Sequence, residues 1–253
     1  MADHNGATGF AADGTSGLVF THNIASNSLD GFVILLVDSS RFVMNTADHN
    51  LRNGFAALNS ASDVFSRNVV KGNRENGTGF VFLGSSDLWV ENNAAEDVFG
   101  ACFSLGSFDG PGTSATTLVG NTAARCRSGF GLDLATANTL KGNKATNGNP
   151  GGEGFALGPS AELNVLSGNV AIDNDDGFKL WSQGNGGASH NLLTGNIANR
   201  NAKSGFLVQE DASYNSFVRN FAHGNGEWDA LQATNAGPGN LWIGNRFGVA
   251  AGF

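Results

Sequence analysis

Residues 164–180 read NVLSGNVAIDNDDGFKL, and this stretch decides the fold. Its pattern, N-x-L-x-G-N-x-A-x-x-N followed by G-F-x-L, recurs along the whole chain. A Gly-Phe step marks each copy, and successive steps lie 21 to 29 residues apart. A repeat with a period in the twenties predicts a solenoid in which each copy forms one coil. The steps are Gly9-Phe10, Gly31-Phe32, Gly54-Phe55, Gly79-Phe80, Gly129-Phe130, Gly154-Phe155, Gly177-Phe178 and Gly205-Phe206, with weakened copies at Gly100-Ala101 and Asp229-Ala230.

The residues around each step predict strands rather than helices. Apolar residues alternate with others over short runs such as 32–34, 130–132 and 178–180, which is the period of a β-strand. Leucine-rich repeats would need helical segments, but Gly, Asn, Ser and Thr interrupt every candidate helix. We therefore expect an all-β fold, a single-stranded parallel β-helix of about ten coils that forms one domain over residues 1–253.

Asparagines recur at fixed places in the copies and predict ladders at the corners of the coils. An Asn amide both donates and accepts hydrogen bonds, and Asn tolerates left-handed backbone. Stacked one strand spacing apart, about 4.8 Å, such side chains are able to bond to one another. One ladder is expected at Asn23, Asn45, Asn68, Asn92, Asn121, Asn143, Asn169, Asn196, Asn220 and Asn245, and a second at Asn138, Asn164, Asn191, Asn215 and Asn240.

The repeated pattern resembles the repeats of right-handed parallel β-helix proteins. This superfamily includes pectate-lyase-like enzymes, alginate epimerases, phage tailspikes and the β-helix proteins of nitrous oxide reductase maturation. The resemblance covers essentially the whole chain and implies right-handed coils, in agreement with the rule for parallel crossovers. It selects no activity, because these repeats serve many functions. The Asp-Pro-His stretch of alginate epimerases and the Gly-His-Gly element of polygalacturonases are both absent.

The composition of the chain limits the classes of binding partner that we expect. Charged residues make up 14% of the chain and the formal net charge is −8, so no basic surface for nucleic acid is expected. No apolar run has the length of a membrane span, so we expect no membrane partner. The polar start is not a signal peptide, which leaves a cytoplasmic protein or a secreted one whose leader was trimmed. Cys102 and Cys126 fall at different points of the repeat, and we expect no disulfide between them.

Insertions that interrupt the repeat predict a binding face. Long segments follow the Gly-Phe strand at 104–113, 181–190 and 233–239, and the segment 147–153 precedes it. Because these segments leave the coils at the edges of one sheet, we expect them to wall its outer face over the later coils. Neutral drift of tolerated insertions is the alternative explanation.

The polar half of that face supplies the candidate site. Glu153 and Asp176 precede the Gly-Phe step in adjacent copies, and two carboxylates one strand spacing apart should titrate separately, as an acid/base pair requires. Lys179 would stabilise developing negative charge, and Trp181 would hold a substrate. Further substrate contacts are expected from Asp133, His190, Gln209 and Glu210. Solvated turn carboxylates are the alternative, beside a surface salt-bridge ladder of Arg127, Gly152, Asp175, Lys203 and Glu227.

The apolar half of the same face predicts a subunit interface. Large aliphatic side chains in neighbouring coils exceed what scattered surface residues need. We therefore expect a homo-oligomer formed through Val33, Leu35, Leu58, Val81 and Leu83.

These patterns predict an enzyme, a lyase or isomerase that uses carboxylate acid/base chemistry on a saccharide or another small metabolite. A non-catalytic carbohydrate-binding or structural assembly module is one alternative. A cytoplasmic cyclase or isomerase of an apolar metabolite is another. No cofactor is expected, with a bridging Ca²⁺ left open. Met44 is isolated and the five His are dispersed, so the sequence has no cluster that suggests copper.

Overall fold

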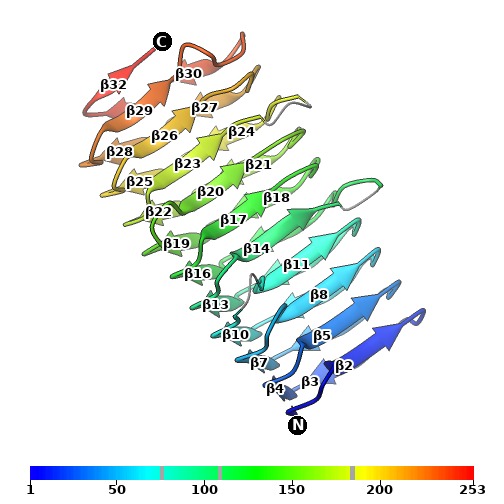
Figure 1. Cartoon of the computed structure of the whole chain (residues 1–253). Coiled ribbons are helices and arrows are strands. Elements are labelled where there is room, and N and C mark those ends of the chain that lie inside the picture. The colour runs from blue at the N-terminus through cyan, green and yellow to red at the C-terminus, as the bar shows by residue number, and fades with distance from the viewer. Residues whose placement is uncertain (75–76, 108–109, 183–185) are drawn as a thin grey trace.

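The computed structural model describes residues 1–74, 77–107, 110–182 and 186–253. Within these ranges the chain contains strands and no helix, and the strands form three parallel sheets of 11, 11 and 10 strands. Figure 1 shows the coils stacked into a ladder with the two chain ends at its opposite ends. The predicted right-handed parallel β-helix of about ten coils is confirmed.

Each coil contributes one strand to each sheet. The sheet that carries the Gly-Phe steps, called the Gly-Phe sheet, contains β2 (Thr8–Asp13), β5 (Asp30–Leu35), β8 (Phe55–Leu58), β11 (Phe80–Leu83), β14 (Ala101–Gly106), β17 (Ser128–Leu132), β20 (Glu153–Leu157), β23 (Asp176–Leu180), β26 (Ser204–Val208), β29 (Trp228–Gln232) and β32 (Ala250–Ala251). The Leu sheet contains β3 (Val19–Thr21), β6 (Arg41–Val43), β9 (Val64–Ser66), β12 (Trp89–Glu91), β15 (Thr117–Val119), β18 (Thr139–Lys141), β21 (Val165–Ser167), β24 (Leu192–Thr194), β27 (Ser216–Val218) and β30 (Leu241–Ile243).

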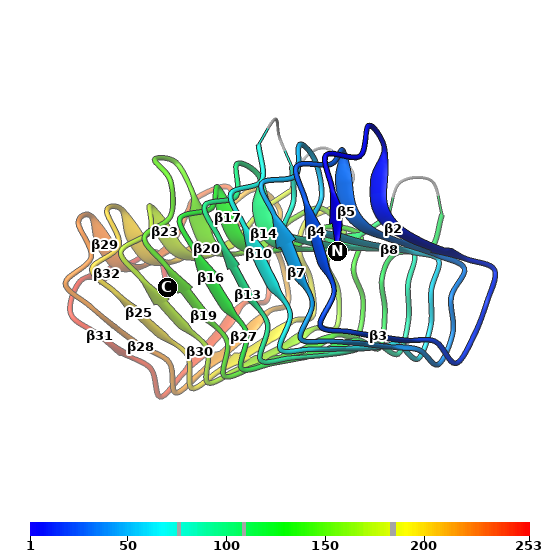
Figure 2. The same cartoon turned by 90° about the horizontal axis from the view of Figure 1, so that it is seen from below.

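The third sheet is called the Ala sheet. Along the chain, each of its strands after the first follows a strand of the Leu sheet and precedes the Gly-Phe strand of the next coil. It contains β1 (Ala2–Asp3), β4 (Ile24–Ser26), β7 (Thr46–Asp48), β10 (Val69–Lys71), β13 (Ala94–Glu96), β16 (Thr122–Ala124), β19 (Lys144–Thr146), β22 (Val170–Ile172), β25 (Ile197–Asn199), β28 (Phe221–His223) and β31 (Arg246–Phe247). Figure 2 shows the Gly-Phe sheet and the Leu sheet on opposite sides of the coil.

Stacked phenylalanines fill the core beneath the Gly-Phe sheet. The rings of Phe155 and Phe178 are nearly parallel, with centroids 4.7 Å apart, which is the spacing of the strands that carry them. The preceding glycine allows the strand to approach its neighbours. A Cβ on Gly154 would lie 2.7 Å from the carbonyl oxygen of Gly177 and 2.8 Å from the Cβ of Ala171. A larger residue at this position would therefore push the backbone outward.

The weakened fifth copy is aligned differently from the prediction. Phe103 stacks between Phe80 and Phe130, with 4.8 Å between ring centroids on each side. Cys102 consequently occupies the glycine position of this coil. The prediction that Gly100-Ala101 is the fifth step is wrong by two residues, because the continuous stack selects the aromatic side chain rather than the glycine.

Asparagine side chains form the predicted corner ladders. Oδ1 of Asn169 accepts from the backbone N–H of Asn143 at 2.9 Å and from its Nδ2 at 3.0 Å. Nδ2 of Asn169 donates in turn to Oδ1 of Asn196 at 3.0 Å. The second predicted ladder repeats this pattern from Asn138 to Asn240. Each amide therefore satisfies backbone and side-chain groups that the core would otherwise leave without partners.

One member of the first ladder differs from the prediction. Asn93 is buried and donates to Oδ1 of Asn121 at 3.0 Å. The predicted member, Asn92, has left-handed backbone with φ of 53° and lies exposed in the turn before it. The prediction is wrong by one residue, because adjacent asparagines are indistinguishable in the repeat until one is turned into the core.

Cys102 and Cys126 form a disulfide, so the prediction of unpaired cysteines is wrong. Their Cα atoms are 5.7 Å apart. Cys102 occupies the glycine position, and Cys126 occupies the corner position that holds Asn174 two coils later. These two positions face each other across successive coils, since a Cβ on Gly154 would lie 3.1 Å from Nδ2 of Asn174. Places that look unrelated along the repeat are therefore neighbours in space.

Several loop predictions fall on positions outside the described residues, namely Phe108, Asp109, Gln183, Gly184 and Asn185. The parts of the insertions that are described leave the coils at the margins of the Gly-Phe sheet, as predicted. In the described parts of the chain, no helix is long and apolar enough to cross a membrane.

Candidate functional site

The candidate site lies on the outer face of the Gly-Phe sheet, over β17, β20, β23 and β26. Register pairs Glu153 with Asp176 on adjacent strands, as predicted, and Ser128 with Glu153 one strand earlier. The middle column aligns Ala156 with Lys179. The face is hollowed because two small residues, Gly131 and Ala156, form its floor between larger walls.

A groove of about 440 Å³, called the central groove, lies over this floor. Asp133 and Glu153 line it together with Lys179, Trp181 and Arg127. Nζ of Lys179 lies 3.3 Å from Oε1 of Glu153, and the two side chains are 24% and 21% exposed. The ion pair therefore lies partly shielded from water, where its electrostatic interaction is stronger than on an open surface. Four of the predicted site residues are brought together here: Asp133, Glu153, Lys179 and Trp181.

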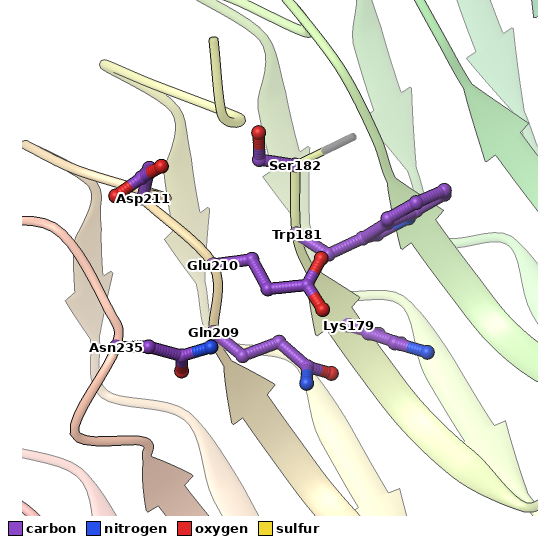
Figure 3. Close-up of a pocket in the computed structure, with 7 residues that line it drawn as sticks. All are labelled: Lys179, Trp181, Ser182, Gln209, Glu210, Asp211 and Asn235. Carbon is purple, nitrogen blue, oxygen red and sulfur yellow. The ribbon is translucent and has the colours of Figure 1, made fainter. Parts of the chain in front are cut away.

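Lys179 and Trp181 line both the central groove and a second hollow next to it. Nζ of Lys179 lies 5.8 Å from the centroid of the Trp181 ring, within the range of a cation–π contact. Figure 3 shows both side chains leaning toward the preceding strand. The second hollow, called the distal hollow, has a volume of about 580 Å³ and contains the predicted residues Gln209 and Glu210.

Asp133 rests its carboxyl group against the loop after β20. A Cβ on Gly158 would overlap Oδ1 of Asp133 and would lie 3.4 Å from Cε2 of Trp181. The missing side chain at position 158 therefore leaves room for both groups above the strand end. Partial removal of the Asp133 carboxyl from water raises its pKa, and the negative charge of Glu153 adds to this effect.

Asp176 lies beneath the face rather than in the groove. It is 6% exposed, and its Oδ1 accepts from the backbone N–H of Ser204 at 3.1 Å. Burial raises its pKa, the Ser204 N–H and the charges of Lys179 and Lys203 oppose this, and Glu153 adds a smaller increase. Asp176 lines neither the central groove nor the distal hollow among the described residues.

Two charged or titratable residues near the site, Lys203 and His190, have their partners outside the two hollows. Lys203 forms an ion pair with Asp175 at 2.9 Å in the column next to Asp176, as expected for the predicted salt-bridge ladder. His190 lies apart from both hollows. Its Nδ1 is 3.3 Å from Oε1 of Glu162, and its ring stacks on Tyr214 at 5.3 Å. The structure therefore does not bring His190 to the groove.

Several groove residues were not predicted from the sequence. Arg127 was assigned only to a surface ladder, yet it lines the central groove. Asp211 and Asn235 line the distal hollow, and Figure 3 shows Asn235 pointing toward Gln209. Oγ of Ser128 is buried at the groove without a hydrogen-bond partner among the described residues. The insertion at 233–239 was the available signal for Asn235.

The apolar half of the face exposes fewer side chains than predicted. Ala56 and Val81 are 4% and 9% exposed, so the larger aliphatic residues around them supply the exposed surface. Leu35, Leu58 and Leu83 line a hollow of about 290 Å³ with Pro111 at its edge. The predicted oligomer interface at these residues stays a prediction.

The coils, ladders and groove define a right-handed parallel β-helix protein with a polar groove across one sheet. Residues 106–247 match the family described as periplasmic copper-binding protein (NosD), and the chain belongs to this family. Residues 2–111 match the family described as right handed beta helix region. A search of curated proteins gives no match to the sequence.

Solved structures with the same fold include several enzymes. The periplasmic alginate epimerase AlgG superposes with a TM-score of 0.63 and 14% identity, over 89% of this chain and 62% of that chain. The catalytic domain of a GH87 α-1,3-glucanase gives 0.62 and 13%, over 95% and 59%. The AlgE6 A-module, a mannuronan C-5 epimerase from Azotobacter vinelandii, gives 0.58 and 18%, over 94% and 59%. This chain spans about three fifths of their lengths, and at these identities the likeness shows the fold alone.

The residues present do not fit the copper that the family name implies. Copper favours thiolate, thioether and imidazole ligands. Both cysteines are held in the disulfide, and no group of three or more His, Cys, Asp or Glu side chains among the described residues could hold a metal ion. His190 is engaged with Glu162, and His49 lies 2.8 Å from Asp48 in another sheet.

Proposed function

We propose that the protein is a saccharide-acting enzyme of the lyase or isomerase type, with the central groove as its active site. The observation that carries this proposal is the Lys179–Glu153 ion pair, which faces Asp133 across a floor of small residues and lies beside Trp181. A flat sugar face stacks well on an indole ring. The shared fold of two alginate epimerases supports a saccharide as the substrate class.

The groove assigns distinct roles to its charged groups. Glu153 would remove the proton from the carbon next to the carboxyl or carbonyl group of a sugar, and the electron pair of that C–H bond would move into this group. The ammonium of Lys179 would stabilise the resulting negative charge. Asp133, which lines the same groove, would donate a proton. In an isomerase that proton goes to the same carbon from the opposite face, and in a lyase it goes to the departing oxygen.

Asp176 takes a positioning role in this proposal, in place of the acid/base role expected from the sequence. Its bond to the Ser204 N–H fixes the first residues of β23 and β26, on which the Lys179 side chain is carried. The disulfide supports a location in an oxidising compartment, because such bonds persist there and are rare in reducing cytosol.

A non-catalytic saccharide-binding module is the second candidate. The ion pair itself is compatible with such a module, because Oε1 of Glu153 is already engaged by Lys179. Both candidates require sugar binding at Trp181, and only the first requires turnover.

The test compares Lys179→Ala with Lys203→Ala as a matched control. Both lysines form an ion pair with a carboxylate on the neighbouring strand, but Lys203 lies outside the central groove. Mannuronate and glucose oligosaccharides would be supplied as substrates, with product formation followed by NMR and binding by calorimetry. Turnover lost in Lys179→Ala and kept in Lys203→Ala supports the enzyme. Binding that depends on Trp181 without turnover supports the module, and no sugar binding refutes both.

A further inference from the structure

An exposed aromatic ring lies at the other end of the central groove. Phe99, in the turn between β13 and β14, is 55% exposed. Hollows of about 370 and 340 Å³ flank it. The first is lined by Phe99, Arg127, Asn149, Pro150 and Gly151, and these five residues are called the Phe99 platform. A single exposed apolar residue needs no explanation, so the argument rests on what surrounds the ring.

The platform is continuous with the proposed active site. Arg127 and Gly151 line both the central groove and the hollow at Phe99. Lys179 and Trp181 likewise line both the central groove and the distal hollow. One depression therefore runs across the sheet from β14 to β26, over four strand spacings or roughly 20 Å. A depression of this length fits a chain of several sugar rings rather than a single ring.

Charge changes sign along this depression. At the Phe99 end the described lining residues include three arginines, Arg74, Arg125 and Arg127, and a single carboxylate, Asp97. Arg125 is held by two carboxylates: its Nε is 2.6 Å from Oδ1 of Asp97, and its Nη2 is 3.1 Å from Oε2 of Glu96. Arg127 forms no ion pair with any described residue. At the opposite end, Glu210 and Asp211 line the distal hollow.

An unpaired arginine beside an exposed ring has a specific binding capacity. A guanidinium presents planar donors that match a carboxylate or sulfate, while the ring offers an apolar surface for the C–H face of a sugar. The amide of Asn149 adds a donor and an acceptor at the same hollow. In a protein with net charge −8, such a positive place would favour acidic sugars over neutral ones.

We propose that the Phe99 platform is a second sugar-binding subsite, which takes an anionic sugar of an extended chain whose reacting sugar lies at Lys179. This inference rests on the proposed saccharide function of the central groove. It names the substrate class as an acidic oligosaccharide, with an anionic ring at Phe99 and the remainder leading past Trp181.

The test measures dissociation constants by calorimetry for three probes: dimannuronate, tetramannuronate and the neutral cellotetraose. Wild-type protein should bind tetramannuronate more tightly than either of the others. Arg127→Ser and Phe99→Ala should each weaken tetramannuronate binding about tenfold. Phe99→Ala should leave dimannuronate binding unchanged, since the dimer occupies the Trp181 region. Matched controls are Arg219→Ser and Phe221→Ala, which remove an exposed arginine and a 41% exposed phenylalanine outside the depression.

The possible outcomes distinguish failure of this inference from failure of the proposed function. Tetramannuronate binding that falls in Trp181→Ala but not in Arg127→Ser or Phe99→Ala overturns the subsite and leaves the proposed function standing. Cellotetraose binding as tight as that of tetramannuronate, with equal losses in both variants, overturns the assignment of an anionic ring. Absence of binding to all three probes overturns the subsite and the proposed function together.

Discussion

Replacement of Asn169 by alanine tests the claim that the asparagine ladders hold the coils together. Asn169 is fully buried in the middle of the longer ladder. Its side chain accepts from the backbone N–H and Nδ2 of Asn143, and donates to the carbonyl oxygen of Leu140 at 2.9 Å and to Asn196. Asn169→Ala removes all four bonds from an interior that water does not reach.

The hydrogen bonds that the former partners of Asn169 keep determine how much the free energy of unfolding falls. Nδ2 of Asn143 keeps its bond to the carbonyl oxygen of Leu118, and Oδ1 of Asn196 keeps the backbone N–H of residue 169. The backbone N–H of Asn143 loses the acceptor it has in the structure, and a buried unsatisfied donor costs about 1–3 kcal/mol. The other three bonds contribute about 1 kcal/mol each before their remaining partners compensate. We expect a loss of about 3–5 kcal/mol in the free energy of unfolding.

Asn23→Ala provides the matched control at the end of the same ladder. Its side chain makes one bond among the described residues, from Nδ2 to Oδ1 of Asn45 at 3.1 Å, and that oxygen still accepts from the backbone N–H of residue 23. The site is only partly buried, so we expect a loss below about 1 kcal/mol. The contrast between the variants isolates the buried ladder from the general effect of Asn→Ala.

Urea unfolding followed by circular dichroism measures both variants, with the disulfide intact. Because a solenoid can unfold in segments, amide hydrogen exchange near Asn143 should be measured in parallel. Protection there should fall in Asn169→Ala and persist in Asn23→Ala. Equal losses in the two variants, or unchanged protection at Asn143, would refute the view that the ladder stabilises the coils through buried backbone groups.

Three further predictions concern other parts of the molecule. Burial raises the pKa of Asp63 from 3.8 to about 6. Because the pKa is higher in the folded state, the free energy of unfolding should fall as pH rises from about 4 to 6. In urea titrations, Asp63→Asn should abolish that fall and gain up to about 3 kcal/mol above pH 6. Cys102→Ala/Cys126→Ala should lose about 3 kcal/mol, as expected for a crosslink over 24 residues, and become insensitive to reductant. Leu58→Asp/Leu83→Asp should convert the proposed oligomer into a monomer in sedimentation, and a wild-type monomer at micromolar concentration would contradict the proposed interface.

The fold could be predicted because its physical causes repeat. A stack of phenylalanines and a ladder of asparagines each require the same residue once per coil, so the period was visible before the structure. The wrong predictions occur where one copy of the repeat contains two candidate residues for the same position. At Asn92 and Asn93, and at Gly100-Ala101 and Phe103, burial and ring stacking choose between neighbours, and a single sequence carries no direct record of that choice.

The candidate site was predictable only in part, because it depends on contacts between coils. Glu153, Lys179 and Trp181 depart from the repeat and were identified on that ground. The sequence did not reveal that Asp176 turns beneath the sheet to meet Ser204, or that Asp133 rests over Gly158. Both facts concern side-chain direction, which alternation along one strand does not fix when a neighbouring coil offers a hydrogen bond or a gap.

The middle outward column of the Gly-Phe sheet shows why this scaffold separates fold from chemistry. Its inward neighbours are nearly constant, while the column itself changes freely from coil to coil. Because the ladders and the ring stack stabilise each coil, we expect a substitution at an exposed position of the column to cost the fold little and to change what the face can bind. Solved structures at 13–18% identity therefore share the solenoid without prescribing its groove. For the same reason, a chain in a copper-binding family can lack a copper ligand set in its described residues and still keep every coil. From β14 to β26 this column changes from Ser104 through Gly131, Ala156 and Lys179 to Leu207, while the coils beneath it keep one strand in each sheet.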